Sequence, residues 1–322
     1  MKIERRQWLA LLSSWLRFWF SPFSLAQLAA MRIGIGLVSL YLLFVTSFDL
    51  EAHFGPASWS NRAAMLALDP LPWPFSAFHW FGTPFWAWAV HIFSILVALA
   101  FMTGVHPFWS GGGLLLLLFS YAHRNPGVVT GLEPMVWMSV FYLSLTPCGR
   151  MFGAMADREF GRQGYRAEPD DPSEGPHWEG LPIRILQIHV AILYFLGGLE
   201  KLNPDWLAGG AFWNPRLVEA GLPAGQDVLR ANPQQSIWFI YGAILLHLFF
   251  PVLVWMRQTR YPMLILALVF HVAIAAVWGK IAQHLLMLVL LIPFIAPSHV
   301  DRFVGWVFEA LDRPSRRRKE AA

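Results

Sequence analysis

Lys201 is the residue of this 322-residue chain best suited to act as a base. It follows the glycine pair 197–198, which opens space beside a helix, and it precedes Pro204, which ends one. Because burial penalises a charged amine, a lysine in apolar surroundings can lose its proton near neutral pH and then accept one from a substrate. Two structural alternatives stay open, a lysine that extends its amine towards water and a lysine that pairs with Glu200.

Arg32 is a second cation inside an apolar stretch. It precedes residues 33–36, Ile-Gly-Ile-Gly, whose small residues permit close contact between helices. A charge in apolar surroundings costs several kcal/mol and therefore faces a bundle interior or a wet cavity. Arg32 either joins helix ends through carbonyls or a carboxylate, or it binds an anion or oxygen of a ligand.

The histidines predict no metal centre. Two ligands on one helical face need a spacing such as His-x-x-x-His or Glu-x-x-His, and no histidine within or beside an apolar segment has either. Hydrogen bonding inside a helical bundle is their expected role, and a metal or haem site assembled from separate segments is the alternative. The single cysteine, Cys148, excludes an internal disulfide. The histidines within or beside apolar segments are His79, His91, His123, His189, His247, His271 and His284.

The composition requires a membrane protein. Apolar residues make up 56% of the chain and charged residues 14%, against about a quarter charged in soluble domains. A soluble enzyme, a disordered chain and a disulfide scaffold are therefore excluded. We predict an all-α polytopic integral membrane protein with about eight transmembrane helices, in a range of seven to nine. The expected spans are residues 25–48, 84–103, 108–122, 132–147, 182–202, 235–256, 262–279 and 283–297.

The basic residues orient these spans. Seventeen of the 24 Lys and Arg residues fall on the side that holds both termini and five on the other side. Because basic residues accumulate in cytoplasmic loops, we expect both termini in the cytoplasm, with the protein in a bacterial inner membrane. This topology accounts for a pI near 9.4, so we expect membrane lipid as a partner and no nucleic acid.

Five segments complete the predicted organisation. Residues 1–23 have an apolar face at helical spacing and predict an interfacial amphipathic helix, with a cleaved signal peptide as the alternative. Residues 24–300 form the transmembrane bundle. Within it, the Trp- and Pro-rich segment 49–83 predicts an aromatic outer loop, and the polar segment 148–180 predicts an inner loop that is a linker or binds a partner. Residues 301–322 form a basic cytoplasmic tail.

Three separated stretches carry motifs that occur together in a known family. They are residues 24–37 with 49–56, residues 124–133 with 142–149, and residues 183–188 with 194–209. In this order and spacing they resemble the horizontally transferred transmembrane (HTTM) domain. That domain is the membrane part of vitamin K-dependent gamma-carboxylases.

The resemblance implies a catalytic base. In the carboxylases a lysine deprotonates vitamin K hydroquinone, oxygen adds, and the strong base that results removes a proton from a substrate glutamate so that carbon dioxide can add. Lys201 is the matching residue, which implies base chemistry at the outer membrane face with a reduced quinone as cofactor and a secreted or membrane peptide as substrate. The expected substrate- or cofactor-binding residues are Arg32, Arg124, Asn125, Tyr194, Glu200 and Trp206.

The chain departs from the carboxylases at two positions. It has Glu200 where they have a basic residue and Pro126 where they have a histidine. The first functional hypothesis is therefore a quinone- or lipid-linked membrane enzyme with carboxylase-like chemistry. The alternative is a non-catalytic membrane factor that binds a lipid, a quinone or a secreted polypeptide during maturation. A small transporter is the third hypothesis.

Overall fold

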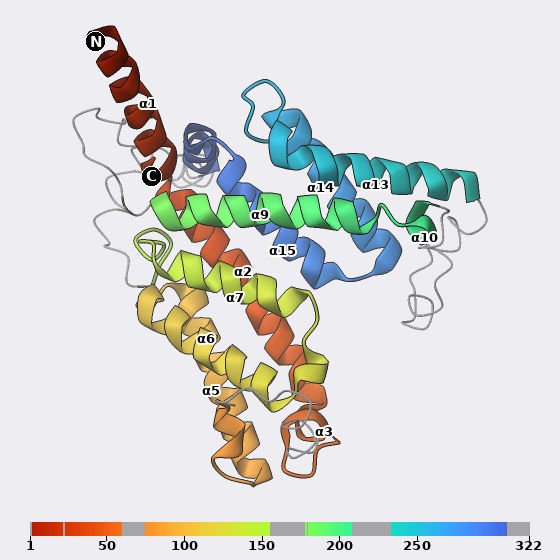
Figure 1. The fold of residues 1–322 in the computed structure, drawn as a ribbon. Helices are drawn as coiled ribbons and strands as arrows, with labels where there is room; N and C mark the ends of the chain where they lie inside the picture. The colour runs from red at the N-terminus through yellow and green to blue at the C-terminus, as the bar shows by residue number, and fades with distance from the viewer. Residues whose placement is uncertain are drawn as a thin grey trace, which may run out of the picture. The chain divides into compact units, whose positions relative to one another are not determined.

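The structure is a computed structural model, and every regular element in its described part is a helix (Figure 1). The chain divides into two compact units, and the division falls inside one helix, α9 (Gly180–Glu200). Unit 1 comprises Met1–Arg184 and Ala296–Ala322, and unit 2 comprises Ile185–Ile295. The described residues are 2–21, 23–59, 75–154, 178, 180–207 and 233–307.

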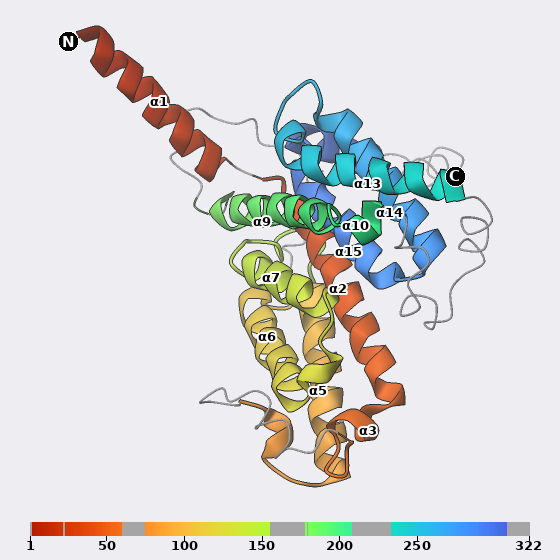
Figure 2. The same cartoon turned by 45° about the vertical axis from the view of Figure 1, so that its right-hand side comes forward.

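Four helices form the core of unit 1. They are α2 (Leu25–Phe48), α5 (Pro84–Thr103), α6 (Pro107–Arg124) and α7 (Leu132–Ser144). Helix α2 packs against α5 and α7, and α6 packs against both α5 and α7, so the four form a closed bundle (Figures 1 and 2). The sequence defines where these helices begin. Ser24 caps α2 in a capping box, and Thr83 caps α5.

Short elements close one end of this bundle. Helix α3 (Leu50–Phe54) contacts α5, and the 3₁₀ turn η1 (Ala77–His79) contacts α5 and α6 (Figure 2). The ring of Phe54 lies 5.0 Å from that of Tyr121 and 5.4 Å from that of Phe78. Phe54 and Phe78 belong to the predicted aromatic outer loop, residues 49–83, whereas Tyr121 belongs to α6. Residues 60–74 of that loop lie outside the described part.

The N-terminal segment predicted to be an amphipathic helix is helical in the structure, as α1 (Lys2–Phe20). Its apolar side chains Trp8, Leu11 and Trp15 are all exposed. An interfacial position for this helix stays a prediction. Most of the predicted inner loop, residues 155–177, and most of the basic tail, residues 308–322, fall outside the described residues.

Unit 2 contains the rest of α9 and four further helices. They are α10 (Pro204–Leu207), α13 (Pro233–Leu253), α14 (Arg260–Trp278) and α15 (Ile281–Leu291), which continues into the 3₁₀ turn η4 (Ile292–Phe294). Helix α13 packs against α10 and α14, and α14 packs against α15. Helix α9 joins this group through Tyr194, whose ring stacks on Phe250 of α13 at 3.9 Å. Figure 1 shows these helices in green to blue.

A helix occurs at each of the eight predicted spans, but fewer qualify as membrane spans. Among the described residues three helices are long and apolar enough to cross a bilayer, namely α2, α5 and α9. The number is four when Ile281–Phe294 and Pro297–Val307 are counted as one broken span. Helices α7 and α15 have 13 and 11 residues, which is short of the roughly 20 that a full crossing needs.

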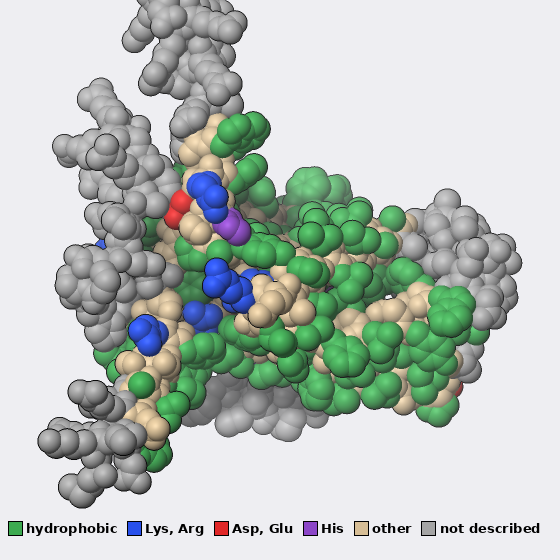
Figure 3. Space-filling view, turned by 90° about the horizontal axis from the view of Figure 1, so that it is seen from above, with side chains coloured by type: hydrophobic (Ala, Val, Ile, Leu, Met, Phe, Trp, Pro, Cys, Tyr) green, Lys and Arg blue, Asp and Glu red, His purple; other side chains and the backbone are tan. Residues whose placement is uncertain are grey.

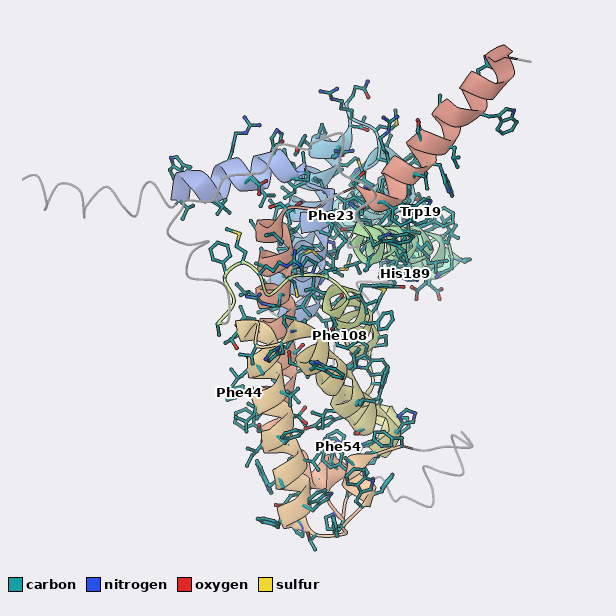
Figure 4. All side chains as sticks on the ribbon, turned by 90° about the vertical axis from the view of Figure 1, so that its left-hand side faces the viewer. Trp19, Phe23, Phe44, Phe54, Phe108 and His189 are labelled. Atoms are coloured by element: carbon teal, nitrogen blue, oxygen red, sulfur yellow. The ribbon has the colours of Figure 1, made fainter. Side chains whose placement is uncertain are left out.

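Apolar side chains cover much of the described surface. Hydrophobic residues dominate the face shown in Figure 3. Phe44 of α2 is exposed and lies at the edge of the bundle (Figure 4). Phe54 of α3 is buried at the end of the bundle that α3 closes (Figure 4). Exposed apolar area of this extent marks a surface that contacts lipid or protein, and it fits a membrane-embedded protein.

Candidate functional site

Lys201 is the first residue after α9, and its amine is turned back onto that helix. Its Nζ donates a hydrogen bond of 2.8 Å to the carbonyl of Gly197. The same atom lies 5.1 Å from the centre of the Trp206 ring, within the range of a cation–π contact. Lys201 is half-buried and Glu200 is exposed, and among the described residues the amine forms no ion pair with that carboxylate.

The chain after Lys201 is folded so that Trp206 returns to it. The amide of Lys201 bonds to the Gly198 carbonyl at 3.1 Å, which tightens the last turn of α9. Asn203 then caps α10, because its side-chain oxygen accepts from the Trp206 amide at 3.1 Å. The sequence Asn-Pro-Asp-Trp therefore starts a new helix at once and presents the Trp206 ring to the amine.

Two glycines bring α13 against the end of α9. A Cβ on Gly198 would lie 2.8 Å from Leu248 Cδ2, closer than side chains pack. A Cβ on Gly197 would lie 3.2 Å from His247 Cδ2, 3.8 Å from His247 Nε2 and 3.8 Å from Lys201 Nζ. The glycine pair thus gives the imidazole room beside the helix and places His247 next to Lys201.

The hydrogen bonding of His247 defines which nitrogen faces the site. Its Nδ1 lies 2.7 Å from the carbonyl of Ala243, an acceptor, so Nδ1 carries the proton. In the neutral ring Nε2 is therefore an acceptor, and it is the nitrogen close to Gly197 and Lys201. The rings of Tyr194 and Phe270 flank the imidazole at 5.3 and 5.1 Å.

Tyr194 lies two turns before Lys201 in α9 and is buried. Its hydroxyl is 2.6 Å from Nε2 of His271 in α14. An apolar cluster lies beside the site, built on Ile240 and Ile244 of α13 and completed by Trp206, Leu207, Phe239 and Leu248. Basic, hydroxyl and aromatic groups are thus gathered within unit 2.

Arg32 lies in unit 1, where it joins backbone segments. Its side chain is fully buried, and its guanidinium donates to four carbonyls. They are those of Met102, at 3.1 Å, Cys148, Met151, at 3.3 Å, and Phe152, at 2.7 Å. This arrangement corresponds to the first of the two roles considered for Arg32, the joining of helix ends through carbonyls. A contribution to ligand binding stays a prediction.

Arg124 and Asn125 also lie in unit 1, at the end of α6. Arg124 donates to the carbonyl of Gly55 at 2.6 Å and to the hydroxyl of Ser58. The Asn125 side chain accepts from the Gly127 amide at 3.2 Å and donates to the His53 carbonyl at 3.4 Å. Both residues hold the segment after α2 against α6, and their predicted role in binding a ligand stays untested.

The structure therefore separates the predicted site residues into groups. Lys201, Glu200, Trp206 and Tyr194 belong to unit 2, and the other three belong to unit 1. His247 was not among the predicted site residues. The glycine pair indicated a close neighbour of α9, but no sequence spacing links that pair to a histidine about 50 residues further along the chain. Within the described ranges, no group of three His, Cys, Asp or Glu side chains could hold a metal ion.

Comparison with known proteins identifies the family. The HTTM domain matches residues 20–298, which include every predicted site residue and all the helices of both units except most of α1 and the last helix. No curated protein and no solved structure gives a significant match. Since the domain match covers most of the chain and the helices that it covers are apolar, this chain is a membrane protein that belongs to the HTTM domain family.

Proposed function

We propose that this protein is a membrane enzyme that uses Lys201 as a general base on a reduced quinone at the outer face of the membrane. The observation that carries the proposal is the convergence of two nitrogen bases. Lys201 Nζ and His247 Nε2 lie beside the same glycine, and Trp206 lies over the amine. The resemblance to the carboxylase membrane domain assigns the base to the same lysine.

The contacts of the amine suit proton abstraction. In the neutral amine one N–H can donate to the Gly197 carbonyl, as the 2.8 Å distance requires, and the lone pair remains for a ligand hydroxyl. Nζ then takes up the hydroxyl proton and becomes an ammonium. That ammonium keeps its bond to the carbonyl and is stabilised by the face of Trp206.

His247 orients the ligand in this proposal. Because its Nδ1 proton is engaged by Ala243, its Nε2 offers a lone pair on the same side as Lys201. A hydroxyl held by that nitrogen is directed towards the amine. Phe270 packs against the imidazole and limits its rotation, so His247 is a positioning residue.

The surroundings fit an aromatic, lipid-soluble ligand. The apolar cluster that includes Trp206 and Leu248 adjoins the two bases, and Phe270 and Tyr194 add aromatic faces. A reduced quinone would bring an acidic aromatic hydroxyl and the electrons for reaction with oxygen. The protein itself supplies the base, the orientation and the apolar environment.

Oxygen uptake driven by a defined quinol tests the proposal. Purified protein in lipid nanodiscs is mixed with vitamin K hydroquinone, and the rate is compared among wild type, Lys201→Met, Lys201→Arg and the control Lys280→Met. We expect the two Lys201 variants to lose about hundredfold or more, because a positioned base contributes at least that much. The control removes an exposed lysine of the turn between α14 and α15 and is expected to stay within about twofold.

Two outcomes oppose the proposal. Equal uptake in wild type and both Lys201 variants removes the base from the reaction. Saturable binding of the hydroquinone to wild type with no oxygen uptake identifies the protein instead as a non-catalytic membrane factor that binds quinone.

A further inference from the structure

A hydrogen-bonded chain of three amphoteric side chains crosses unit 2. The Tyr194 hydroxyl of α9 lies 2.6 Å from His271 Nε2 of α14. The other nitrogen of that ring, Nδ1, lies 3.2 Å from Nδ1 of His284 in α15. Tyr194 and His271 are buried, whereas His284 is partly exposed one turn after the loop that joins α14 to α15.

The proton count of this chain permits two arrangements. A neutral imidazole has one N–H, and both nitrogens of His271 are engaged, so one nitrogen donates while the other accepts. In the first arrangement Tyr194 donates to His271, which donates to His284, and the outer nitrogen Nε2 of His284 carries a proton. In the second arrangement both bonds are reversed and that outer nitrogen carries none.

Conversion of the first arrangement into the second moves one proton through the protein. The Tyr194 oxygen receives a proton and passes its own to His271 Nε2. His271 then passes its Nδ1 proton to His284, which releases a proton from Nε2. One proton enters, one leaves, and no residue keeps a charge.

We propose that Tyr194, His271 and His284 form a proton-transfer chain that carries the proton collected at the Lys201 site to the partly exposed edge of His284. This inference rests on the proposed function. Tyr194 and Lys201 are seven residues apart on one face of α9, which corresponds to roughly 10 Å along the helix. His247 lies between them, with its ring 5.3 Å from that of Tyr194.

Unit 1 contains a second hydrogen-bonded tyrosine and histidine, and their network has a structural role only. The Tyr121 hydroxyl lies 2.7 Å from His91 Nδ1, and His91 Nε2 lies 2.8 Å from the Ser47 hydroxyl. That hydroxyl also bonds to the carbonyl of Leu43 at 3.1 Å. A carbonyl cannot pass a proton on, so this network ends in the backbone, whereas the chain in unit 2 ends at a partly exposed imidazole.

Rescue by a small proton carrier tests the chain. Tyr194→Phe removes the hydroxyl and keeps the ring that stacks on Phe250, and His284→Gln keeps hydrogen-bonding atoms that cannot relay a proton. Oxygen uptake with vitamin K hydroquinone is measured in dilute buffer, with and without added imidazole. Both variants are expected to fall about tenfold and to recover with imidazole. The matched control Tyr121→Phe, which removes the hydroxyl of another buried tyrosine, is expected to stay within about twofold and not to respond to imidazole.

The outcomes separate the two proposals. Wild-type activity that depends on Lys201, together with full activity of Tyr194→Phe and His284→Gln or losses that imidazole does not restore, overturns the chain and leaves the base intact. If wild type shows no quinol-dependent uptake, the proposed function fails, and ¹⁵N NMR of the histidines tests the proton-transfer chain by itself. Exchange of His271 and His284 between tautomers as a pair supports it. Two rings that each hold one tautomer from about pH 5 to about pH 9 overturn it.

Discussion

Lys201 Nζ and His247 Nε2 lie at the same distance, 3.8 Å, from the position that a Cβ on Gly197 would occupy. The amine comes from the end of α9 and the imidazole from the middle of α13. A residue without a side chain therefore separates the two bases. A methyl group added at Gly197 would therefore lie beside both bases.

A methyl group at Gly197 is expected to disturb the site more than the fold. In Gly197→Ala the new Cβ meets His247 Cδ2 at 3.2 Å, so the imidazole must move and its contact with the ligand hydroxyl is lost. We expect quinol-dependent turnover to fall by about tenfold with normal protein abundance. Gly242→Ala is the control, because a Cβ there meets nothing within 4 Å. Equal turnover in the two variants contradicts a positioning role for His247.

Alanine substitutions at two adjacent glycines of α6 are expected to change the free energy of unfolding in opposite directions. A Cβ on Gly111 would overlap the Ser144 hydroxyl of α7, whereas a Cβ on Gly112 has nothing within 4 Å. Gly111→Ala is therefore expected to lower the free energy of unfolding by roughly 2 kcal/mol through overpacking. Gly112→Ala is expected to raise it by up to about 1 kcal/mol, because alanine favours the helix. Denaturant unfolding in detergent measures both, and a similar change in the two variants disagrees with the packing of α6 on α7.

Removal of Arg32 is expected to destabilise unit 1. In Arg32→Met the four carbonyls that the guanidinium binds lose their donor, and an uncharged, unbranched apolar side chain takes its place. We expect a loss on the order of 3 kcal/mol in the free energy of unfolding. Arg257→Met, at an exposed arginine, is expected to change it by less than about 0.5 kcal/mol. Unchanged unfolding of Arg32→Met together with lost quinol binding favours a ligand role for Arg32.

The Cys148 thiol gives a prediction with a defined pH dependence. Burial raises the pKa of the Cys148 thiol from 9.0 to about 11, although the nearby Arg32 opposes the shift. The thiol is therefore neutral at physiological pH, and its neutral form stabilises the folded state below about pH 9. That stability is lost as the pH rises through about 11. We expect slow maleimide labelling of the folded protein at neutral pH and fast labelling after denaturation.

Labelling reports on this residue alone, because Cys148 is the only cysteine in the chain. Rapid modification of the folded protein at neutral pH contradicts its burial. So does a free energy of unfolding that stays constant between about pH 9 and about pH 11.

The positions of the helices could be predicted from the sequence because apolar runs and caps are local signals. The span 84–103, predicted from its apolar run, has the bounds of α5, which Thr83 caps at its start and Gly104 ends. The number of spans could not be predicted in the same way. An apolar run such as 132–147 shows that a segment is hydrophobic, but it does not show how many of its residues are helical. The helix inside this run, α7, ends at Ser144 after 13 residues.

The candidate site could be predicted only along α9. Tyr194, Gly197, Gly198 and Lys201 are close in the sequence and share a helical face, so their grouping is a local property. His247, His271 and His284 come from three other helices, and their contacts depend on how those helices pack. No sequence spacing reports a distance between helices, which is why these histidines were expected only to form ordinary hydrogen bonds.

Rescue of Lys201→Ala by small amines tests the central proposal most directly. The variant keeps the backbone and leaves space where the side chain was, so methylamine can supply the missing base to the bound hydroquinone. We predict that Lys201→Ala loses quinol-dependent oxygen uptake and regains it with methylamine in proportion to the neutral amine present. Tetramethylammonium at equal ionic strength is predicted to restore nothing. Full uptake without any amine, or a loss that methylamine never restores, contradicts a base at this position.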